Sequence, residues 1–256
     1  MTALAVLTAA GSGVRLGCDG PKALAVVAGR TVLDRAAEGL AAAGVSALVV
    51  TAPESELERF RSVLPGHVPS RPEVPVVLVA GGASRQASVA AGLEAVPEAA
   101  ELAGVELGED TPVLVHDAAR CLTPPEVVGR VVAAVEAGSV AVVPGIPVTD
   151  TLKEVEGAGT SAPEGGPVLR VVGTPSRSRL RAVQTPQGFR WAVLLRAHEH
   201  GRALALQEST AATDDAALVE ALGLPVDLVE GDPRSLKITT RSDLLLAEML
   251  LGPDPD

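Results

Sequence analysis

The sequence is poor in aromatic residues and in lysine. Its 256 residues include two phenylalanines, one tryptophan and no tyrosine, so the core must be aliphatic, and base stacking on aromatic platforms is excluded. Acidic residues outnumber basic ones by 32 to 21, which gives a net charge of −11 and argues against a nucleic-acid partner. Three of the 21 basic residues are lysines, namely Lys22, Lys153 and Lys237.

Cysteine is scarce as well, and no targeting or membrane segment is evident. Cys18 and Cys121 form no C-x-x-C pair, and the N-terminus lacks a basic region followed by an apolar stretch and a cleavage site. The longest uncharged valine-rich stretch, residues 137–149, is shorter than the roughly 20 residues that a membrane helix needs. We therefore expect a cytoplasmic protein with no membrane partner.

Short apolar runs alternate with helical patterns along the chain. The runs lack period-2 alternation, which is typical of strands buried on both faces; they cover residues 3–10, 47–51, 76–80, 113–116 and 140–143. Helices are predicted over residues 31–43, 55–64 and 124–137, and Ser55 and Glu58 have capping-box spacing. The pattern predicts an α/β fold with a doubly wound, mostly parallel sheet.

The alternation breaks between Gly145 and Gly188. Residues 151–156 and 168–173 are predicted to form two strands joined by a flexible loop. We expect a β-arm, about residues 146–180, that projects from a single domain spanning residues 1–256. Apolar strands with little core of their own favour a partner surface, so the arm predicts a homodimer, with an ordinary surface hairpin as the alternative.

A glycine-rich segment, GSGVRLG, follows the first predicted strand. Its glycines let backbone N–H groups approach phosphates closely. A dinucleotide fingerprint would need glycine in place of Leu16, and no acidic residue ends the second strand, so an NAD-dependent oxidoreductase is disfavoured. Arg15 within the segment and Lys22 after Pro21 would neutralise charge that builds up on a phosphorus under attack.

Two further segments follow predicted strands, at the sheet edge where ligands of such folds bind. In GGASRQAS, the glycines would admit a base or sugar, Ser84 is a candidate helix N-cap, and Ser88 can donate a hydrogen bond. In HDAAR, Asp117 is well placed to hold Mg²⁺ on the phosphates of a nucleotide. Alternatively, Asp117 simply pairs with Arg120.

The C-terminal half carries further polar candidates. Thr213, followed by two aspartates, predicts a helix N-cap, and His198 and His200 are expected on a solvated surface. A cationic strip beside the arm suits an anionic substrate and consists of Arg177, Arg179 and Arg181.

Seven motifs in order resemble those of the 2-C-methyl-D-erythritol 4-phosphate cytidylyltransferases of the non-mevalonate isoprenoid pathway. They are AAGSGVRLG…PK, GGASRQASV, VHDAAR, DTLK, TPSR…QTPQGF, TDDA and LKIT, and they cover nearly the whole chain. The resemblance implies a Rossmann-like sheet of the nucleotide-diphospho-sugar transferase type. It also implies a magnesium-dependent transfer of CMP from CTP that yields 4-CDP-2-C-methyl-D-erythritol and pyrophosphate, in a homodimer that exchanges β-arms.

The resemblance implies roles for residues at the motif positions. Arg15 and Lys22 would stabilise the transition state, while Arg177 and Lys237 would position the acceptor phosphate. CTP and its magnesium would contact Ala9, Ala10, Gly11, Ser12, Gly13, Gly82, Ala83, Ser88, Asp117 and Ala118. The polyol phosphate would contact Asp117, Arg120, Thr151, Arg177, Thr185 and Thr213, with Thr151 and Arg177 reaching it from the partner subunit.

Three departures from the family pattern leave the proposed cations untouched. Cys121 stands where many relatives have proline, Asp215 replaces a common glutamate, and the arm loop of residues 157–167 is long. Two alternatives stay open beside the oxidoreductase. One is a D-ribitol 5-phosphate cytidylyltransferase, which shares the fold and nearly all of these motifs; the other is a noncatalytic nucleotide-binding regulator.

Overall fold

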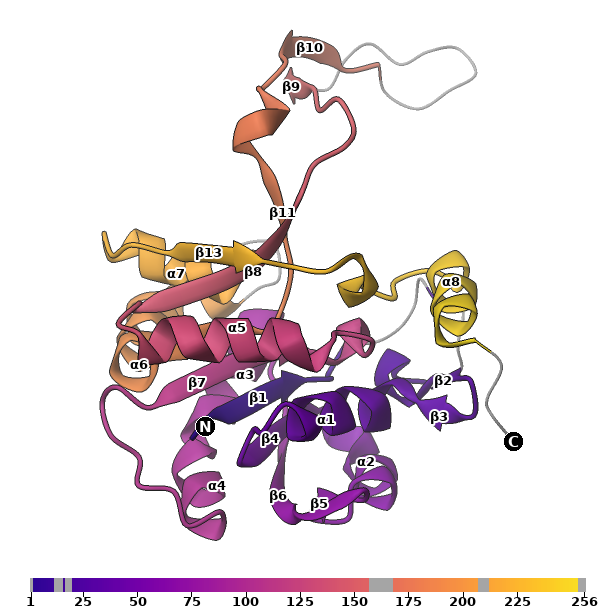
Figure 1. Cartoon of the computed structure of the whole chain (residues 1–256), viewed down its shortest axis with the longest axis vertical. Coiled ribbons are helices and arrows are strands. Elements are labelled where there is room, and N and C mark those ends of the chain that lie inside the picture. Colours follow the sequence, from indigo (N-terminus) through magenta and orange to yellow (C-terminus); the bar gives the residue numbers. More distant parts are fainter. Residues whose placement is uncertain (1, 12–15, 17–19, 157–167, 207–211, 253–256) are drawn as a thin grey trace.

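A mixed central sheet with helices on both faces forms the body of the protein (Figure 1). The computed structural model describes residues 2–11, 16, 20–156, 168–206 and 212–252. The nine strands of the sheet run in the order β11-β8-β12-β7-β1-β4-β6-β5, with β13 paired to β8. They are β1 (Leu4–Thr8), β4 (Ala47–Ala52), β5 (His67–Val68), β6 (Arg71–Ala80), β7 (Pro112–Asp117), β8 (Ala141–Pro147), β11 (Arg181–Val183), β12 (Gln187–Arg190) and β13 (Asp227–Glu230).

The centre of the sheet is parallel, as the sequence predicts. Strands β7, β1, β4 and β6 pair in parallel, whereas β12 lies antiparallel between β7 and β8. Ala5 and Leu7 of β1 pack into the apolar cluster on one face, while Leu4 and Val6 pack into the cluster on the other face. Burial on both faces explains why the strand sequences are apolar at every position.

The helices divide between the two faces of the sheet. One face carries α1 (Val32–Ala42), α2 (Leu57–Val63), α5 (Pro125–Glu136) and α8 (Arg241–Leu251). The opposite face carries α3 (Arg85–Glu94), α4 (Val96–Leu102), α6 (Trp191–His200) and α7 (Asp215–Ala221). These two layers confirm the doubly wound α/β fold. No helix in the described ranges is long and apolar enough to cross a membrane.

Shorter elements connect the layers. A small hairpin consists of β2 (Val26–Val27) and β3 (Arg30–Thr31). The 3-10 helices are η2 (Lys22–Leu24), η3 (Glu54–Glu56), η4 (Ala118–Arg120), η5 (Arg177–Arg179), η6 (Arg202–Leu206) and η7 (Pro233–Ser235).

Two of the predicted helix starts are wrong. Helix α2 begins at Leu57 after η3, and no side chain caps it, so the capping box of Ser55 and Glu58 does not form. Helix α7 is capped by Asp214 instead of Thr213, because the Asp214 carboxylate accepts the backbone N–H of Ala217 at 3.0 Å. The predicted N-cap Ser84 is confirmed, and it accepts the backbone N–H of Ala87 at 3.0 Å.

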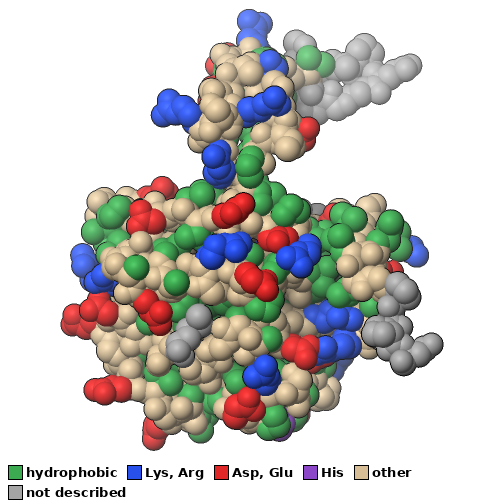
Figure 2. All heavy atoms as spheres, in the orientation of Figure 1, with side chains coloured by type: hydrophobic (Ala, Val, Ile, Leu, Met, Phe, Trp, Pro, Cys, Tyr) green, Lys and Arg blue, Asp and Glu red, His purple; other side chains and the backbone are tan. Residues whose placement is uncertain are grey.

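The predicted arm projects far from the body (Figure 1). Its antiparallel strands, β9 (Glu154–Glu156) and β10 (Arg170–Gly173), are shorter than expected, and the loop of residues 157–167 lies outside the described residues. Figure 2 shows basic side chains gathered on the arm. Its exposed apolar side chains are Leu152, Val155, Val168, Leu169, Val171 and Val172.

Candidate active site

Two adjoining pockets open at the carboxyl ends of β1 and β7. The larger has a volume of about 510 Å³ and the smaller about 180 Å³, and both are lined by Arg85, Asp117 and Lys237. Predicted residues in the larger pocket are Ala9, Ala10, Gly11, Lys22, Gly82, Ala83, Ser88, Asp117, Ala118 and Lys237. Predicted residues in the smaller pocket are Asp117, Arg120, Thr185, Thr213 and Lys237. The structure therefore brings residues predicted to bind the nucleotide next to residues predicted to bind the acceptor. The two pockets share a wall formed by Arg85, Asp117 and Lys237, which we call the seam.

Several predicted residues lie elsewhere. Ser12, Gly13 and Arg15 lie outside the described residues. Thr151 and Arg177 lie on the arm and line neither pocket of their own chain, and Nη1 of Arg177 donates to the backbone oxygen of Thr149 at 2.5 Å. Because neither residue lines a pocket of its own chain, the expected exchange of arms stays a prediction.

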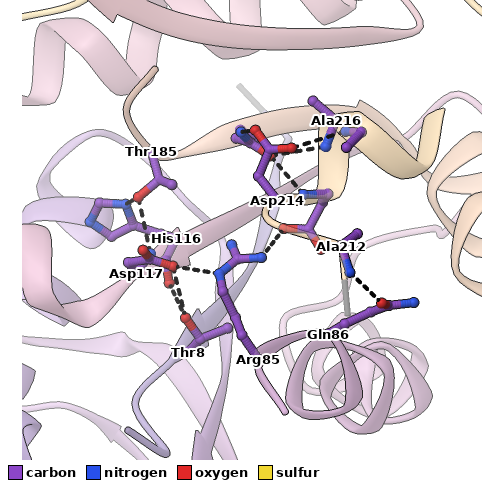
Figure 3. A network of polar contacts seen from close by, with 12 residues as sticks. Thr8, Arg85, Gln86, His116, Asp117, Thr185, Ala212, Asp214 and Ala216 are labelled. Carbon is purple, nitrogen blue, oxygen red and sulfur yellow. Dashed lines mark hydrogen bonds and ion pairs between the residues drawn. The ribbon is translucent and has the colours of Figure 1, made fainter. Parts of the chain in front are cut away.

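Asp117 is the centre of the seam (Figure 3). Its Oδ1 accepts from Nε of Arg85 at 2.9 Å and from the Thr8 hydroxyl at 3.2 Å, while Nζ of Lys237 lies 2.7 Å from Oδ2. Burial alone would raise the pKa of Asp117, but Arg85 and Lys237 outweigh it and hold the pKa well below its usual range. The carboxylate is therefore charged under all ordinary conditions.

The alternative pairing of Asp117 with Arg120 is wrong. Nη1 of Arg120 donates to the backbone oxygen of Ser235 at 2.6 Å, and Nη2 donates to that of Val183 at 3.3 Å. Arg120 thereby ties η4 to the segments that precede β12 and follow β13 while lining the smaller pocket.

Thr185 holds the end of β7 in place. Its hydroxyl accepts the backbone N–H of Asp117 at 3.0 Å and lies 2.9 Å from Nδ1 of His116 (Figure 3). Burial lowers the pKa of His116 to about 4, so the imidazole is neutral at physiological pH. Thr185, for which the resemblance implies a substrate contact, therefore also orients the backbone of Asp117.

The two glycines after β6 are needed for close packing. A Cβ on Gly81 would lie 2.6 Å from Cβ of Ala10, and one on Gly82 would lie 2.5 Å from Cβ of Ala87. The Ser88 hydroxyl accepts the backbone N–H of Gly82 at 3.1 Å and donates to the backbone oxygen of Ser84 at 2.9 Å. Ser88 therefore fixes the turn that forms one wall of the larger pocket.

Arg85 is the main site residue that sequence reasoning missed. Besides Asp117, it binds Asp215, with Nη1 lying 2.8 Å from Oδ2. A basic residue in the first turn of a helix opposes the helix dipole, and this mismatch was the available signal that Arg85 pairs with acids elsewhere. His198 was expected in solvent but is buried, and its Nε2 lies 2.9 Å from Oδ1 of Asp215.

Comparison with known proteins identifies the family of the chain. The family model described as 2-C-methyl-D-erythritol 4-phosphate cytidylyltransferase (IspD) matches residues 3–253. The curated enzymes of that name from Rhodococcus opacus and Nocardia farcinica are 46% and 47% identical over 249 residues, which is 97% of this chain and 94% and 93% of theirs. The crystal structure of the Thermus thermophilus enzyme of that name is 39% identical, with a TM-score of 0.66 over 96% of this chain and 97% of that one. The chain therefore belongs to the 2-C-methyl-D-erythritol 4-phosphate cytidylyltransferase family.

Proposed function

We propose that this protein is a nucleotidyltransferase that moves CMP from CTP to 2-C-methyl-D-erythritol 4-phosphate and releases pyrophosphate, in isoprenoid precursor biosynthesis. The observation that carries this proposal is the pair of unequal pockets that share Arg85, Asp117 and Lys237. The larger pocket suits a nucleoside triphosphate, and the smaller one suits a small polyol phosphate. Their shared wall is where a phosphate of one substrate would meet a phosphate of the other.

The reaction joins two anions, so charge neutralisation is its main requirement. A phosphate oxygen of the acceptor attacks the α-phosphorus of CTP and forms a new P–O bond, while the bond from that phosphorus to the β-phosphate oxygen breaks and pyrophosphate leaves. The attacking oxygen is already anionic, so no general base is needed. Lys22 lines the larger pocket, where a cation stabilises the charge that develops on the α-phosphoryl group. Lys237 lines both pockets, which suits it to position the acceptor phosphate beside CTP.

We propose Asp117 as the residue that would hold Mg²⁺. It is the one acidic side chain among the described residues that line the larger pocket. Magnesium in nucleotide sites is commonly bound by one or two carboxylates together with phosphate oxygens, so a single ionised carboxylate fits a metal that arrives with CTP. The described residues contain no cluster of three or more metal-binding side chains, which agrees with a metal carried by the nucleotide. Bound magnesium would supply further neutralisation of phosphate charge.

We also propose that the protein is a homodimer in which each arm reaches the pocket of the other subunit. The arm exposes a row of apolar side chains, and it carries Thr151 and Arg177 away from the pockets of their own chain. An exposed apolar hairpin is costly for a monomer and is stabilised when a second copy covers it.

Pyrophosphate release tests the proposed activity. Purified protein is incubated with CTP and Mg²⁺, and with either 2-C-methyl-D-erythritol 4-phosphate or D-ribitol 5-phosphate as the acceptor. We expect release with the methylerythritol phosphate and a product of the mass of the CDP-alcohol. Release with ribitol phosphate alone would overturn the assignment of the acceptor. Tight CTP binding without release of pyrophosphate in the presence of either acceptor would identify a nucleotide-binding regulator instead.

A further inference from the structure

A line of polar side chains, of which Asp117, Asp215 and His198 are buried, runs from the seam of the pockets into the body of the protein. It starts at Asp117 on β7, passes through Arg85 on α3 and Asp215 on α7, and ends at His198 on α6. The distances between successive polar atoms are 2.9, 2.8 and 2.9 Å. Asp215 and His198 line neither pocket, so substrate recognition alone does not explain them.

Asp215 is held firmly in this line. It is 1% exposed, and its backbone N–H donates to Oε1 of Gln187 at 3.1 Å. Its two carboxylate oxygens face different partners, Nε2 of His198 on one side and Nη1 of Arg85 on the other. Burial would raise the pKa of Asp215, but Arg85 and His198 outweigh it and lower the pKa. The position of this charged group is therefore fixed from β12, α6 and α3.

Arg85 in turn lies between two carboxylates. Its Nε points to Asp117 (Figure 3), whereas its Nη1 lies 2.8 Å from Oδ2 of Asp215. The plane of the guanidinium is therefore set by Asp215 as well as by Asp117. Because both acids hold Arg85, it can fix the orientation of the Asp117 carboxylate. Lys237 also contacts Asp117, but its side chain is 42% exposed and is therefore held less firmly than that of Arg85, which is 18% exposed. The orientation of the Asp117 carboxylate thus depends on an aspartate that lines neither pocket.

We propose that Asp215, held by His198, is a positioning residue that fixes the guanidinium of Arg85 and thereby the carboxylate of Asp117 at the seam of the two pockets. The catalytic consequence rests on the function proposed above, whereas the positioning itself does not. Removing the Asp215 charge replaces no residue that lines the pockets, but it frees Arg85 to rotate, so Asp117 loses its fixed partner.

Proton exchange at Arg85 tests the positioning without any substrate. The Nε–H signal of Arg85 is identified in ¹⁵N–¹H spectra by its loss in Arg85→Lys. We expect Asp215→Asn to speed exchange of this proton with water by about tenfold or more, because the second anchor of the guanidinium is weakened. Glu220→Gln removes an exposed carboxylate from the same helix, α7, and should leave the exchange rate unchanged. Equal exchange rates in wild type and Asp215→Asn would overturn the proposal.

Steady-state kinetics test the catalytic consequence. We expect Asp215→Asn to lower kcat by about tenfold or more while KM for CTP changes by less than about threefold, because the pocket walls are retained. A purely structural role would lower Tm and leave kcat of the folded enzyme unchanged, which would contradict the proposal.

His198 provides a second and milder test. His198→Leu should lower kcat by about threefold or more, and His198→Gln, which keeps an N–H donor, should restore most of it. In the Asp215→Asn background, His198→Leu should add less than about twofold, because it acts through Asp215. His200→Leu changes an exposed histidine on the same helix, α6, and serves as the control. Equal kcat values in His198→Leu and His198→Gln, or fully additive effects of His198→Leu and Asp215→Asn on kcat, would contradict the proposal that His198 acts through Asp215.

The two kinds of measurement separate this proposal from the proposed function. If wild type released no pyrophosphate, the proposed function would fail, and the exchange rate of the Arg85 proton would still decide whether Asp215 positions Arg85.

Discussion

Nζ of Lys237 lies 2.7 Å from Oδ2 of Asp117, at the seam that the two pockets share. A lysine ammonium is a compact point charge, whereas an arginine guanidinium is larger and planar. Since the chain otherwise prefers arginine, the lysines in the larger pocket, Lys22 and Lys237, point to a need for the smaller group.

Replacing these lysines by arginine should impair catalysis although the charge is kept. We expect Lys237→Arg and Lys22→Arg each to lower kcat by about tenfold or more, measured as pyrophosphate release at saturating substrates. Lys153→Arg is the matched control, because Lys153 lies on the arm, lines neither pocket, and donates to the Thr174 hydroxyl at 2.7 Å. Near-normal turnover in both pocket variants would show that these positions do not require lysine and that codon usage explains why lysine is scarce.

Exchange of arms predicts that two inactive variants rescue each other. Arg177→Ala damages the arm and leaves its own pocket intact, whereas Lys237→Ala damages the pocket and leaves the arm intact. Each homodimer should be nearly inactive. A co-expressed mixture should recover up to about one quarter of wild-type activity, because half of the dimers are mixed and each mixed dimer has one complete site. Activity no higher than that of the separate variants would show that the arm does not serve the partner.

Stability should depend on pH through His116. Burial lowers the pKa of His116 to about 4, and Arg120 and Arg85 also lower it. In the unfolded chain this pKa is about 6.5. Between these values the unfolded state binds a proton that the folded state does not, so the free energy of unfolding should fall by roughly 3 kcal/mol as the pH drops through this window.

Urea unfolding over this pH range measures the effect. His116→Asn removes the titrating group and keeps a polar partner for Thr185, so its stability curve should be flatter than that of wild type. His200→Asn removes an exposed histidine and should retain the slope of the wild-type curve. Parallel curves for wild type and His116→Asn would contradict the assignment.

Two glycine-to-alanine substitutions should have opposite effects on stability. A Cβ on Gly188 of β12 would overlap Cγ1 of Val131 on α5, so Gly188→Ala should destabilise the protein by about 1–3 kcal/mol. A Cβ on Gly129, inside α5, would meet no atom within 4 Å, so Gly129→Ala should stabilise by about 0.5–1 kcal/mol. Chemical denaturation measures both. Equal midpoints in the two variants would show that packing between β12 and α5 is looser than the structure indicates.

Local sequence patterns predicted the framework of the sheet well. The run that includes Leu4 to Leu7 is apolar throughout because both faces of β1 are covered, and this burial leaves a clear signal in the sequence. Asp117 was located correctly because a polar residue at the end of a buried strand must face the ligand edge. By contrast, the N-cap of α7 was predicted one residue too early, at Thr213 instead of Asp214, because both side chains can cap a helix and they are adjacent in the sequence.

Local sequence patterns could not predict the contacts that join Arg85, Asp215 and His198 behind the seam. Arg85 and Asp215 are far apart in the sequence, and nothing near either residue names the other as its partner. His198 lies on a helix with both exposed and buried faces, so its burial depends on how α6 packs against α7. Long-range pairing of charges is a property of the assembled layers, and local spacing carries little information about it.

The C-terminal approach to the seam has a consequence for synthesis of the protein. Ile238, the neighbour of Lys237, is fully buried, and its backbone N–H donates to the backbone oxygen of Ala119 at 2.8 Å. The segment that carries Lys237 follows β13 and docks beside β7, which the ribosome has made long before. A nascent chain can therefore complete its parallel core and still lack Lys237, so catalytic competence comes later in synthesis than the core of the sheet.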